Sequence, residues 1–313
     1  MLEQERRPTL STRLRASGSL AVLVAVALFV AFVSALFVGG ARSASAPHGL
    51  IAFTRDGDDG VYIMEADGSG VRLLWRGARA VTDLAWSPDG SKLAVTTSGR
   101  SIWVVNVDGT DPVRVARVGA SSLSWSADGR RIAFTSKDDI WLMNADGSNI
   151  RPLERTPRLS EKDVDWKPTG GWVAFATGGY VSQVYVVRTN GTNLRNLPTI
   201  PEFWYLTYPD WSPDGRRIVL TSCASDTNCE VWVTNASGNQ RVQLTKTKDR
   251  VHDVSPVWSP DGRRIAFLRG DYAKSGSFEI YAMNADGTGV TRLTHNRVDE
   301  TSLAWQPVAP TED

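Results

Sequence analysis

The stretch Trp258-Ser259-Pro260-Asp261-Gly262, followed by Arg264-Ile265-Ala266-Phe267, decides the fold of this chain, because close variants of it recur along most of its length. A tryptophan stands at the same place in six units, spaced 39, 41, 45, 47 and 47 residues apart: Trp86, Trp125, Trp166, Trp211, Trp258 and Trp305. A turn sequence similar to Ser-Pro-Asp-Gly follows the first five. Repeats of this period are typical of propellers and other repeat architectures.

The second half of each unit also repeats. An apolar run ends in an Asp-Gly turn, as in Ile102–Gly109, Ile140–Gly147 and Ile280–Gly287, and a further short strand such as the one containing Arg292-Leu293 follows. Asp-Gly between alternating apolar residues is a strong hairpin signal. Each unit is therefore predicted to be a sheet of four short antiparallel strands, which is the blade of a β-propeller.

The two ends of the repeat region complement each other. The repeats begin at Leu50-Ile51-Ala52-Phe53, which corresponds to the second strand of a unit, and end at Leu303–Pro307, which corresponds to a first strand. We therefore expect an all-β, six-bladed propeller over residues 49–307, closed by pairing of the C-terminal strand with the N-terminal blade and followed by a tail, 308–313. Closure removes exposed sheet edges.

These motifs resemble the WD40-like (PD40-type) repeat of TolB-like β-propellers. The resemblance rests on Trp-Ser-Pro-Asp-Gly, Arg-Ile-Ala-Phe and Ile-Tyr-x-Met-Asn-Ala-Asp-Gly, and covers about residues 49–307. It implies a binding role in the cell envelope. Full TolB proteins add an α/β domain before the propeller, and peptidases with similar propellers add a hydrolase domain after it. The sequence shows neither, so we expect a propeller without these domains.

An apolar segment precedes the propeller. Residues 20–38 contain no charge, and a helix of this length spans roughly 28 Å, about the thickness of a bilayer core. We predict a short basic cytoplasmic tail (1–19), a transmembrane anchor (20–39) and a linker (40–48), because arginines precede the segment. The alternative is a signal peptide cleaved near Ala44-Ser45-Ala46, which would give a secreted or periplasmic protein. Both readings place the propeller outside the cytoplasm, in what we expect to be a bacterial envelope.

The charge balance excludes one class of partner. Five arginines and two glutamates lie within the first 42 residues, so 30 basic and 32 acidic residues remain beyond them. Nucleic-acid binding needs a clustered positive excess, which this balance does not provide. We expect no nucleic-acid partner and a monomeric propeller.

Cys223 and Cys229 bracket a short polar segment and are predicted to form a disulfide, as an oxidising compartment allows. Histidines are few, and neither they nor the Asp-Gly turns show the spacing of a zinc or calcium site. No metal and no cofactor are therefore predicted.

Strand order separates two faces of the expected disc. The Ser-Pro-Asp-Gly and Asn-Ala-Asp-Gly turns share one face, named here the turn face. The connections from second to third strands and between blades share the other, named the loop face. Loop-face segments vary in length and chemistry, and function concentrates in such loops. Candidate ligand-binding residues are therefore drawn from this face: Phe203, Trp204, Tyr205, Arg250, His252, Tyr272, His295 and Arg297.

Two of these candidates have a specific rationale. Trp204 fits no repeat position and lies in an aromatic inter-blade connection, where it either binds a partner or covers its own hydrophobic patch. His252 and His295 come from successive connections and are expected to approach each other near the central channel. The other tryptophans that occupy strand positions are expected in the core: Trp75, Trp103, Trp141, Trp172 and Trp232.

The favoured function is a membrane-anchored, extracytoplasmic, non-catalytic platform that binds a protein or peptide partner. One alternative is a lyase or hydrolase acting on envelope polysaccharide or peptide. It lacks a Gly-x-Ser-x-Gly or His-Glu-x-x-His motif, although carboxylates gathered in the channel would support it. Another alternative is an accessory or sensory domain of a membrane complex.

Overall fold

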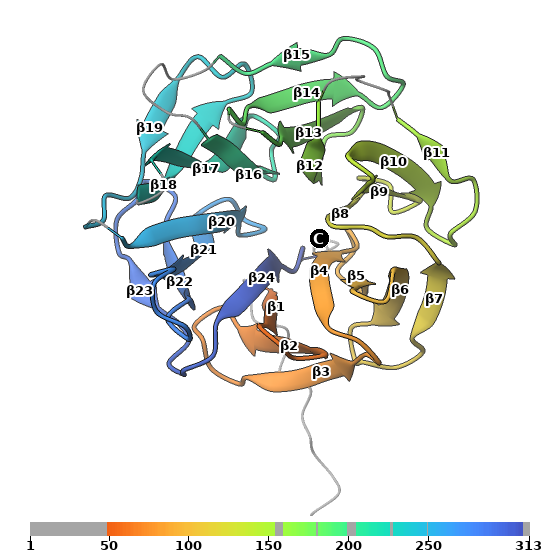
Figure 1. The fold of residues 1–313 in the computed structure, drawn as a ribbon, viewed down its shortest axis with the longest axis horizontal. Coiled ribbons are helices and arrows are strands. Elements are labelled where there is room, and N and C mark those ends of the chain that lie inside the picture. Colours follow the sequence, from red (N-terminus) through yellow and green to blue (C-terminus); the bar gives the residue numbers. More distant parts are fainter. Residues whose placement is uncertain are drawn as a thin grey trace, which may run out of the picture. The chain divides into compact units, whose positions relative to one another are not determined.

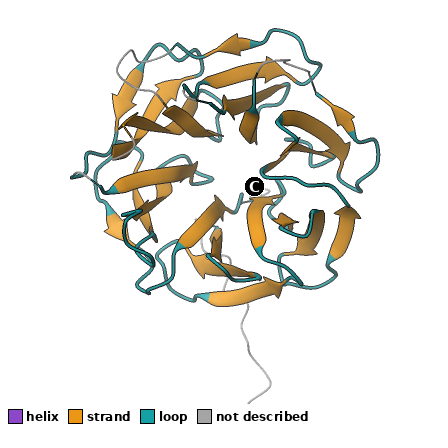
Figure 2. Ribbon diagram, viewed as in Figure 1, coloured by secondary structure: helices purple, strands orange, loops and turns teal. Residues whose placement is uncertain are grey.

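The computed structural model describes residues 49–153, 159–179, 181–198, 205–225, 228–248 and 250–308. Within these ranges the regular structure consists of strands alone, arranged around a central axis (Figures 1 and 2). None of the described residues forms a helix that could cross a membrane. The predicted anchor (20–39) and its flanks, 1–19 and 40–48, lie outside the described residues.

Each blade is a four-stranded antiparallel sheet. The first blade contains β24 (Glu300–Trp305), β1 (Leu50–Arg55), β2 (Gly60–Glu65) and β3 (Arg72–Arg76). The second contains β4 (Val81–Trp86), β5 (Lys92–Thr97), β6 (Ser101–Asn106) and β7 (Val113–Ala116). The third contains β8 (Leu123–Trp125), β9 (Arg131–Ser136), β10 (Asp139–Asn144) and β11 (Arg151–Pro152).

The other three blades repeat this order. The fourth contains β12 (Glu161–Trp166), β13 (Trp172–Thr177), β14 (Val184–Arg188) and β15 (Arg195–Asn196). The fifth contains β16 (Tyr205–Trp211), β17 (Arg217–Ser225), β18 (Asn228–Asn235) and β19 (Arg241–Gln243). The sixth contains β20 (His252–Trp258), β21 (Arg264–Gly270), β22 (Glu279–Asn284) and β23 (Thr291–Arg292).

The ring closes as the sequence predicts. β24 pairs antiparallel with β1, and Ile51 lies opposite Trp305. In Figure 1 the last strand and the first strand accordingly lie side by side in one blade. The prediction of a closed, six-bladed all-β propeller is confirmed.

The core lies between the blades. The second strand of each blade is almost fully buried, and the largest enclosed side chains include Phe53, Phe134, Phe175 and Phe267. Each repeat tryptophan is also buried at the junction with the neighbouring blade; Trp86 and Trp125, for example, donate from their indole nitrogens to the carbonyls of Ala304 and Ala85. The six repeat tryptophans therefore recur because each of them forms contacts between neighbouring blades.

The repeated turns have a local chemical cause. In the turn after β4, Ser87 donates a hydrogen bond to Asp89 at 2.6 Å, and its oxygen accepts from the amide of Lys92 at 2.9 Å. Gly90 has a φ of 67°, a conformation that costs other residues energy. The first-to-second and third-to-fourth strand turns share one end of the antiparallel strands, which confirms the turn face and the loop face.

Five tryptophans expected in the core lie at its margin, and four of them (Trp75, Trp141, Trp172 and Trp232) pack against core clusters. Trp75, Trp103, Trp141, Trp172 and Trp232 are only half-buried. Of the five, only Trp75 lies on an outermost strand; the other four lie on second or third strands that pair on both sides, so their exposure is not caused by a missing neighbouring strand. Trp103 lies beside Trp75, with ring centroids 5.9 Å apart, and Arg114 lies 5.7 Å from the Trp103 ring.

Candidate functional site

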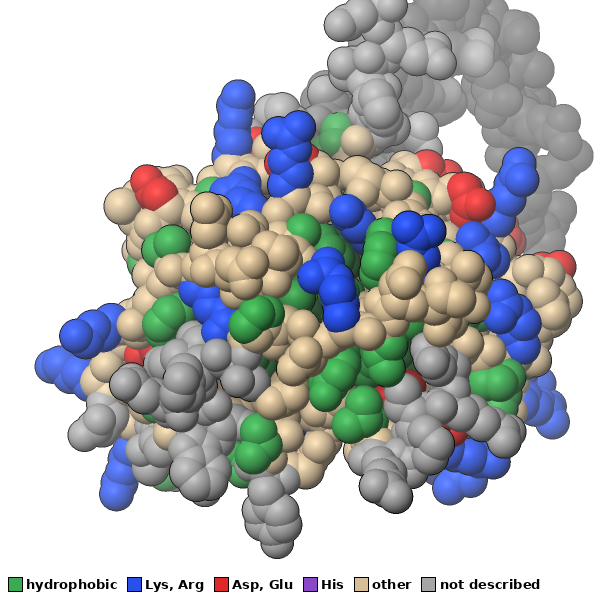
Figure 3. Space-filling view, turned by 90° about the horizontal axis from the view of Figure 1, so that it is seen from above, with side chains coloured by type: hydrophobic (Ala, Val, Ile, Leu, Met, Phe, Trp, Pro, Cys, Tyr) green, Lys and Arg blue, Asp and Glu red, His purple; other side chains and the backbone are tan. Residues whose placement is uncertain are grey.

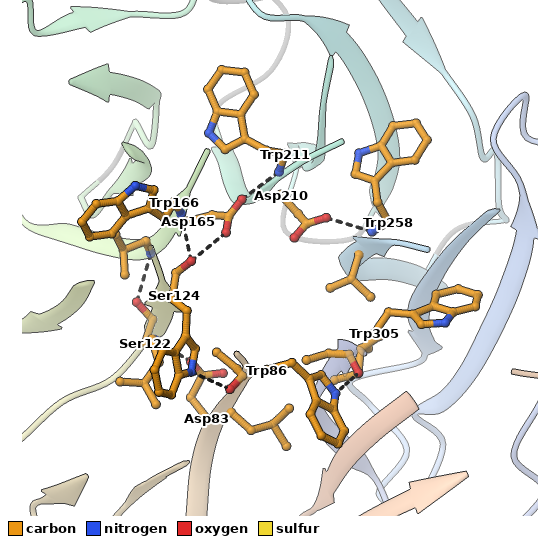
Figure 4. Close-up of a pocket in the computed structure, with 18 of the residues that line it drawn as sticks. Asp83, Trp86, Ser122, Ser124, Asp165, Trp166, Asp210, Trp211, Trp258 and Trp305 are labelled. Carbon is orange, nitrogen blue, oxygen red and sulfur yellow. Dashed lines mark hydrogen bonds between the residues drawn. The ribbon is translucent and has the colours of Figure 1, made fainter. Parts of the chain in front are cut away.

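A channel of about 720 Å³ passes between the six innermost strands, β4, β8, β12, β16, β20 and β24. Its lining runs from Thr82 and Thr301 toward the loop face to Pro88 and Pro307 at the turn face. Figure 4 shows side chains from several blades converging on this space. In this channel, residues from all six blades meet around a common cavity.

Two positions on each inner strand supply the lining, because alternate side chains of a strand point the same way. The position directly before the repeat tryptophan carries Ala85, Ser124, Asp165, Asp210, Val257 and Ala304. The position three residues before it carries Asp83, Ser122, Asp163, Tyr208, Ser255 and Ser302. The lining therefore contains four carboxyl groups.

The first set of polar side chains joins neighbouring blades. Ser124 accepts a hydrogen bond from the backbone amide of Trp166 at 2.9 Å, and Asp165 accepts from the amide of Trp211 at 2.7 Å (Figure 4). Asp210 accepts from the amide of Trp258 at 2.8 Å. At three successive blade junctions, therefore, a side-chain oxygen accepts a hydrogen bond from the backbone amide of the next repeat tryptophan. These bonds fix the positions of the two carboxylates.

The polar side chains three residues before the repeat tryptophan also form hydrogen bonds to neighbouring blades, one layer nearer the loop face. Asp83 accepts from the amide of Leu123 and from the hydroxyl of Ser302, both at 2.8 Å. Asp163 accepts from the amide of Tyr208 at 3.3 Å. Asp83 therefore connects the first, second and third blades around the channel.

Backbone irregularities occur in the same layer. Asp163, Tyr208 and Ser255 have φ values of 52°, 51° and 53°, and the pairing register shifts beside each of them. A positive φ is uncommon outside glycine, especially for a bulky residue such as tyrosine. β-Bulges of this kind release a residue from the ladder, and here each released residue lines the channel.

Confinement in the channel changes the proton affinity of its acids. Burial raises the pKa of Asp83 to about 7, with a contribution from the charge of Asp163, and burial raises the pKa of Asp165 to about 6. Burial and the charge of Asp165 raise the pKa of Asp210 well above its ordinary value. Burial also raises the pKa of Asp163. Asp83 and Asp165 therefore change protonation state close to neutral pH.

The channel carries no compensating base. Among the described lining residues there is no lysine, arginine or histidine. The described residues also contain no group of three or more histidine, cysteine or acidic side chains arranged to hold a metal ion. The geometry is therefore suited to receiving a positively charged group from outside the chain.

The predicted ligand residues lie around this channel rather than in it. Arg250, His295 and Arg297 are exposed on inter-blade connections, and none of them lines the channel. Tyr205 begins β16 and is half-buried against the disulfide-containing core cluster. Phe203 and Trp204 lie outside the described residues.

His252 and Tyr272 do come together. Their ring centroids lie 4.6 Å apart, and Tyr272 also lies 4.7 Å from Phe278. Burial lowers the pKa of His252, so this side chain is neutral at physiological pH. The Tyr272 ring is 67% exposed and caps the histidine. No described contact joins His252 to His295, so the expected approach of the two histidines is not observed.

Tyr208 lies at the loop-face end of the channel. It lines the channel, is 44% exposed and has a φ of 51°. Burial and the charge of Asp163 raise the pKa of Tyr208. Tyr272 lies on the loop between β21 and β22, on the same face of the propeller, and is not among the described residues that line the channel.

The predicted disulfide is present. Cys223 and Cys229 lie opposite each other on β17 and β18, with an S–S distance of 2.03 Å, and there is no free cysteine. The bond ties together the longest hairpin of the propeller beside Tyr205.

The fold and its channel define a six-bladed β-propeller built from WD40-like repeats. The sequence profile of the TolB beta propeller domain matches residues 202–309, and that of the WD domain G-beta repeat matches residues 72–106. This is a TolB-like propeller, and the resemblance seen in the repeats is confirmed.

Two solved structures and one curated protein illustrate what this chain is similar to. TolB from Acinetobacter baumannii superposes with a TM-score of 0.70 at 20% identity, covering 83% of this chain and 67% of that one. A chain of the nidogen/laminin complex superposes with a TM-score of 0.68 at 14% identity, covering 82% and 99%. Dipeptidyl-peptidase 5 from Porphyromonas endodontalis is 22% identical over 227 residues, covering 53% of this chain and 33% of that one. The chain spans about a third of the curated relatives it matches first.

Proposed function

We propose that this propeller is a non-catalytic platform that binds a basic segment of a protein partner in its central channel, outside the cytoplasm. The observation that carries the proposal is the lining: four carboxyl groups face a shared space, and no described lining residue is a lysine, arginine or histidine. A lysine or arginine side chain entering the channel would pair with these acids and favour their ionised forms. Pairing in a confined space is stronger than at an exposed surface.

Rigidity supports the same function. Asp165 and Asp210 each use one oxygen to accept a backbone amide of the next blade, which fixes their position before a ligand arrives. A preorganised site loses less conformational entropy on binding. Tyr208 at the loop-face end of the channel and Tyr272 on the same face add the large amphipathic surfaces that commonly anchor peptides.

Two solved structures with the same fold support a binding role. TolB shares the fold, and so does a chain from a complex of two proteins, nidogen and laminin. These likenesses support a propeller that acts through its surface and channel.

We further propose that residues 20–39 anchor the protein in a membrane with the propeller on the extracytoplasmic side. The uncharged segment and its preceding arginines support this orientation. The disulfide between Cys223 and Cys229 supports an oxidising compartment. Retention of the full chain in membrane pellets after alkaline extraction would test the anchor.

The binding function can be tested by photo-crosslinking in the native cell. A photoreactive residue would replace Tyr208 in the channel, Tyr272 on the loop face, or Asp146 on the turn face as a control. We expect one shared protein to be crosslinked from Tyr208 and Tyr272 but not from Asp146. Crosslinks from Asp146 alone, or from none of the three, would contradict the proposal and favour an accessory role.

A second candidate function rests on Asp165 and Asp210. The charge of Asp165 raises the pKa of Asp210, so the two acids titrate as a coupled pair, as catalytic carboxylates often do. Propellers also occur in peptidase-related chains such as dipeptidyl-peptidase 5. Hydrolysis or elimination of an envelope polysaccharide or peptide, lost in both Asp165→Asn and Asp210→Asn at unchanged ligand affinity, would establish an enzyme instead.

A further inference from the structure

The turn face departs from its repeat pattern in one sector. The first turn of a blade carries an aspartate at Asp89, Asp128, Asp214 and Asp261, and the second turn carries one at Asp67, Asp108, Asp146 and Asp286. The fourth blade has Thr169 and Asn190 at these positions, and the second turn of the fifth blade has Ser237. Three negative charges are thus missing from adjacent turns.

The cations of this sector are rearranged: Lys167 and Arg188 are added, while Gly171 and Trp172 stand where the third blade has Arg130 and Arg131, so the positive excess comes from the missing aspartates. Lys167 replaces the turn serine of other blades and lies 5.0 Å from the Trp211 ring. Arg188 replaces the asparagine found as Asn144 in the third blade. The exposed Arg188 and Arg195 lie 5.1 and 5.7 Å from the ring of Trp172. The result is a basic sector built around a half-buried indole.

Exposed apolar side chains lie on the same face in the five other blades. Exposed aliphatic residues follow the second turn of five blades by three or four residues, at the start of the outer strands: Val71, Val113, Ile150, Val242 and Val290. Figure 3, which views the disc edge-on, shows hydrophobic side chains interspersed with lysine and arginine on the rim. Isolated exposed valines are ordinary, but this set recurs around a single face.

The chain enters the propeller at this same face. The amide of Leu50 donates to the side chain of Gln306 at 3.0 Å, and Gln306 donates to the carbonyl of Gly90 in a turn-face turn at 2.8 Å. The predicted membrane segment ends at residue 39, so nine residues, 40–48, connect it to Gly49, where the described residues begin. Nine residues reach at most about 30 Å.

We propose that the turn face docks on anionic phospholipid headgroups. Arg188 and Arg195 would bind phosphate, Trp172 would lie at the interface, and the aliphatic side chains would contact the headgroup boundary. Trp and basic residues are favoured at membrane interfaces. An acidic protein partner would also match the charge, but the aliphatic set and the entry point of the chain favour a lipid surface. This inference rests on the proposed membrane anchor.

The orientation leaves the loop face and the channel mouth directed away from the bilayer. A partner could then reach Tyr208 and Tyr272 without competing with lipid. The two faces of the disc therefore have separate functions: the turn face binds the membrane, and the loop face binds the partner.

The test uses the full chain in lipid nanodiscs with a fluorescent label on a single introduced cysteine. One label would be placed on the turn face at Asn239→Cys, and one on the loop face at Ser98→Cys. Quenching by lipids that carry a nitroxide on the headgroup would be measured with and without phosphatidylglycerol. We expect strong quenching at position 239 that increases with anionic lipid, and weak quenching at position 98.

Two charge variants provide the matched comparison. Arg188→Gln with Arg195→Gln removes two positive charges from the turn face, while Arg100→Gln with Arg117→Gln removes two from exposed positions on the loop face. Each arginine near an anionic surface is worth roughly a fivefold change in binding. We expect the first pair to abolish the effect of phosphatidylglycerol and the second pair to preserve it.

Several outcomes would overturn the inference. Equal quenching at both positions, or an effect of phosphatidylglycerol unchanged in Arg188→Gln with Arg195→Gln, would do so. Binding of soluble polyglutamate that this pair abolishes, without any lipid effect, would indicate an acidic protein partner instead. If the chain stays in the nanodiscs and still binds a basic peptide, only the docking inference fails. If the chain elutes without lipid, both the docking inference and the proposed membrane anchor are contradicted.

Discussion

Asp210 on β16 accepts a hydrogen bond from the backbone amide of Trp258 on β20 at 2.8 Å, so a channel carboxylate holds the next blade in place. Its neighbour Asp165 does the same for Trp211. These acids face the channel and also belong to the blade junctions. Any variant that tests ligand binding at these positions must therefore be checked for stability.

Stability is expected to fall as pH rises through neutrality. Burial raises the folded-state pKa of Asp83 from 3.8 to about 7. The folded state therefore binds this proton more tightly than the unfolded state, and the resulting stability is present at low pH and lost as pH rises through 7. Between pH 5 and pH 8 the free energy of unfolding should decrease by about 2 kcal/mol from this group.

Denaturant unfolding of Asp83→Asn at the two pH values checks this prediction. The asparagine keeps the size of the side chain and cannot ionise, so the pH-dependent loss should become smaller by that amount. Asp146→Asn, at an exposed turn, serves as control. An unchanged pH dependence in Asp83→Asn would show that Asp83 is already ionised at pH 5.

Removal of one partner from a buried ion pair should be costly. Arg269 contacts Asp253 through two bonds of 2.6 and 2.7 Å, and the Asp253 side chain is fully buried. Arg269→Ala would leave that charge unpaired and should destabilise the protein by about 3 to 5 kcal/mol. Burial already raises the pKa of Asp253 despite its partner, so the loss should be larger at pH 8 than at pH 5.

An exposed pair provides the contrast. Lys274 lies 3.3 Å from Asp271, and its side chain is 75% exposed. Lys274→Ala should change the free energy of unfolding by less than about 1 kcal/mol. Thermal or chemical unfolding of both variants measures the difference, and similar values for the two would contradict the assignment of a buried pair.

The disulfide should contribute modestly to stability. Cys223 and Cys229 are separated by six residues, so the bond closes a short loop. The chain-entropy model gives about 2 kcal/mol for a loop of this size. Cys223→Ser with Cys229→Ser should lower the free energy of unfolding by about this amount, while the wild-type protein under reducing conditions should show the same loss. A much larger loss would mean that the bond maintains the hairpin of β17 and β18.

The sequence predicted the fold because its determinants are local and repeated. Each turn glycine and each tryptophan recurs once per blade, and the pairing of Ile51 with Trp305 follows from matching an incomplete first unit with an incomplete last one. The half-buried state of Trp172, at the start of the second strand β13, was missed because the apolar pattern of a strand does not show how much of each side chain the neighbouring blades cover.

The channel acids were missed for a different reason. The variable loops predicted a binding site on the loop face, whereas the carboxylates occupy regular positions on the inner strands. A signal existed: aspartate precedes the repeat tryptophan in Asp165-Trp166 and Asp210-Trp211, where other units carry small or apolar residues. Only the closed ring shows that these positions, 45 residues apart, face one cavity. The packing of Tyr272 on His252 likewise depends on the conformation of a loop.

The most direct test of the account is the affinity of the full chain for a lysine-rich peptide, measured by calorimetry for the wild-type protein and for Asp165→Asn with Asp210→Asn. We expect the wild-type protein to bind this peptide and not a glutamate-rich peptide of equal length. Binding should be tighter at pH 8 than at pH 5, because Asp83 and Asp165 are ionised at the higher pH. The double variant, shown by circular dichroism to be folded, should lose at least tenfold in affinity. Equal affinity in the wild-type protein and the folded double variant would contradict a binding function for the channel.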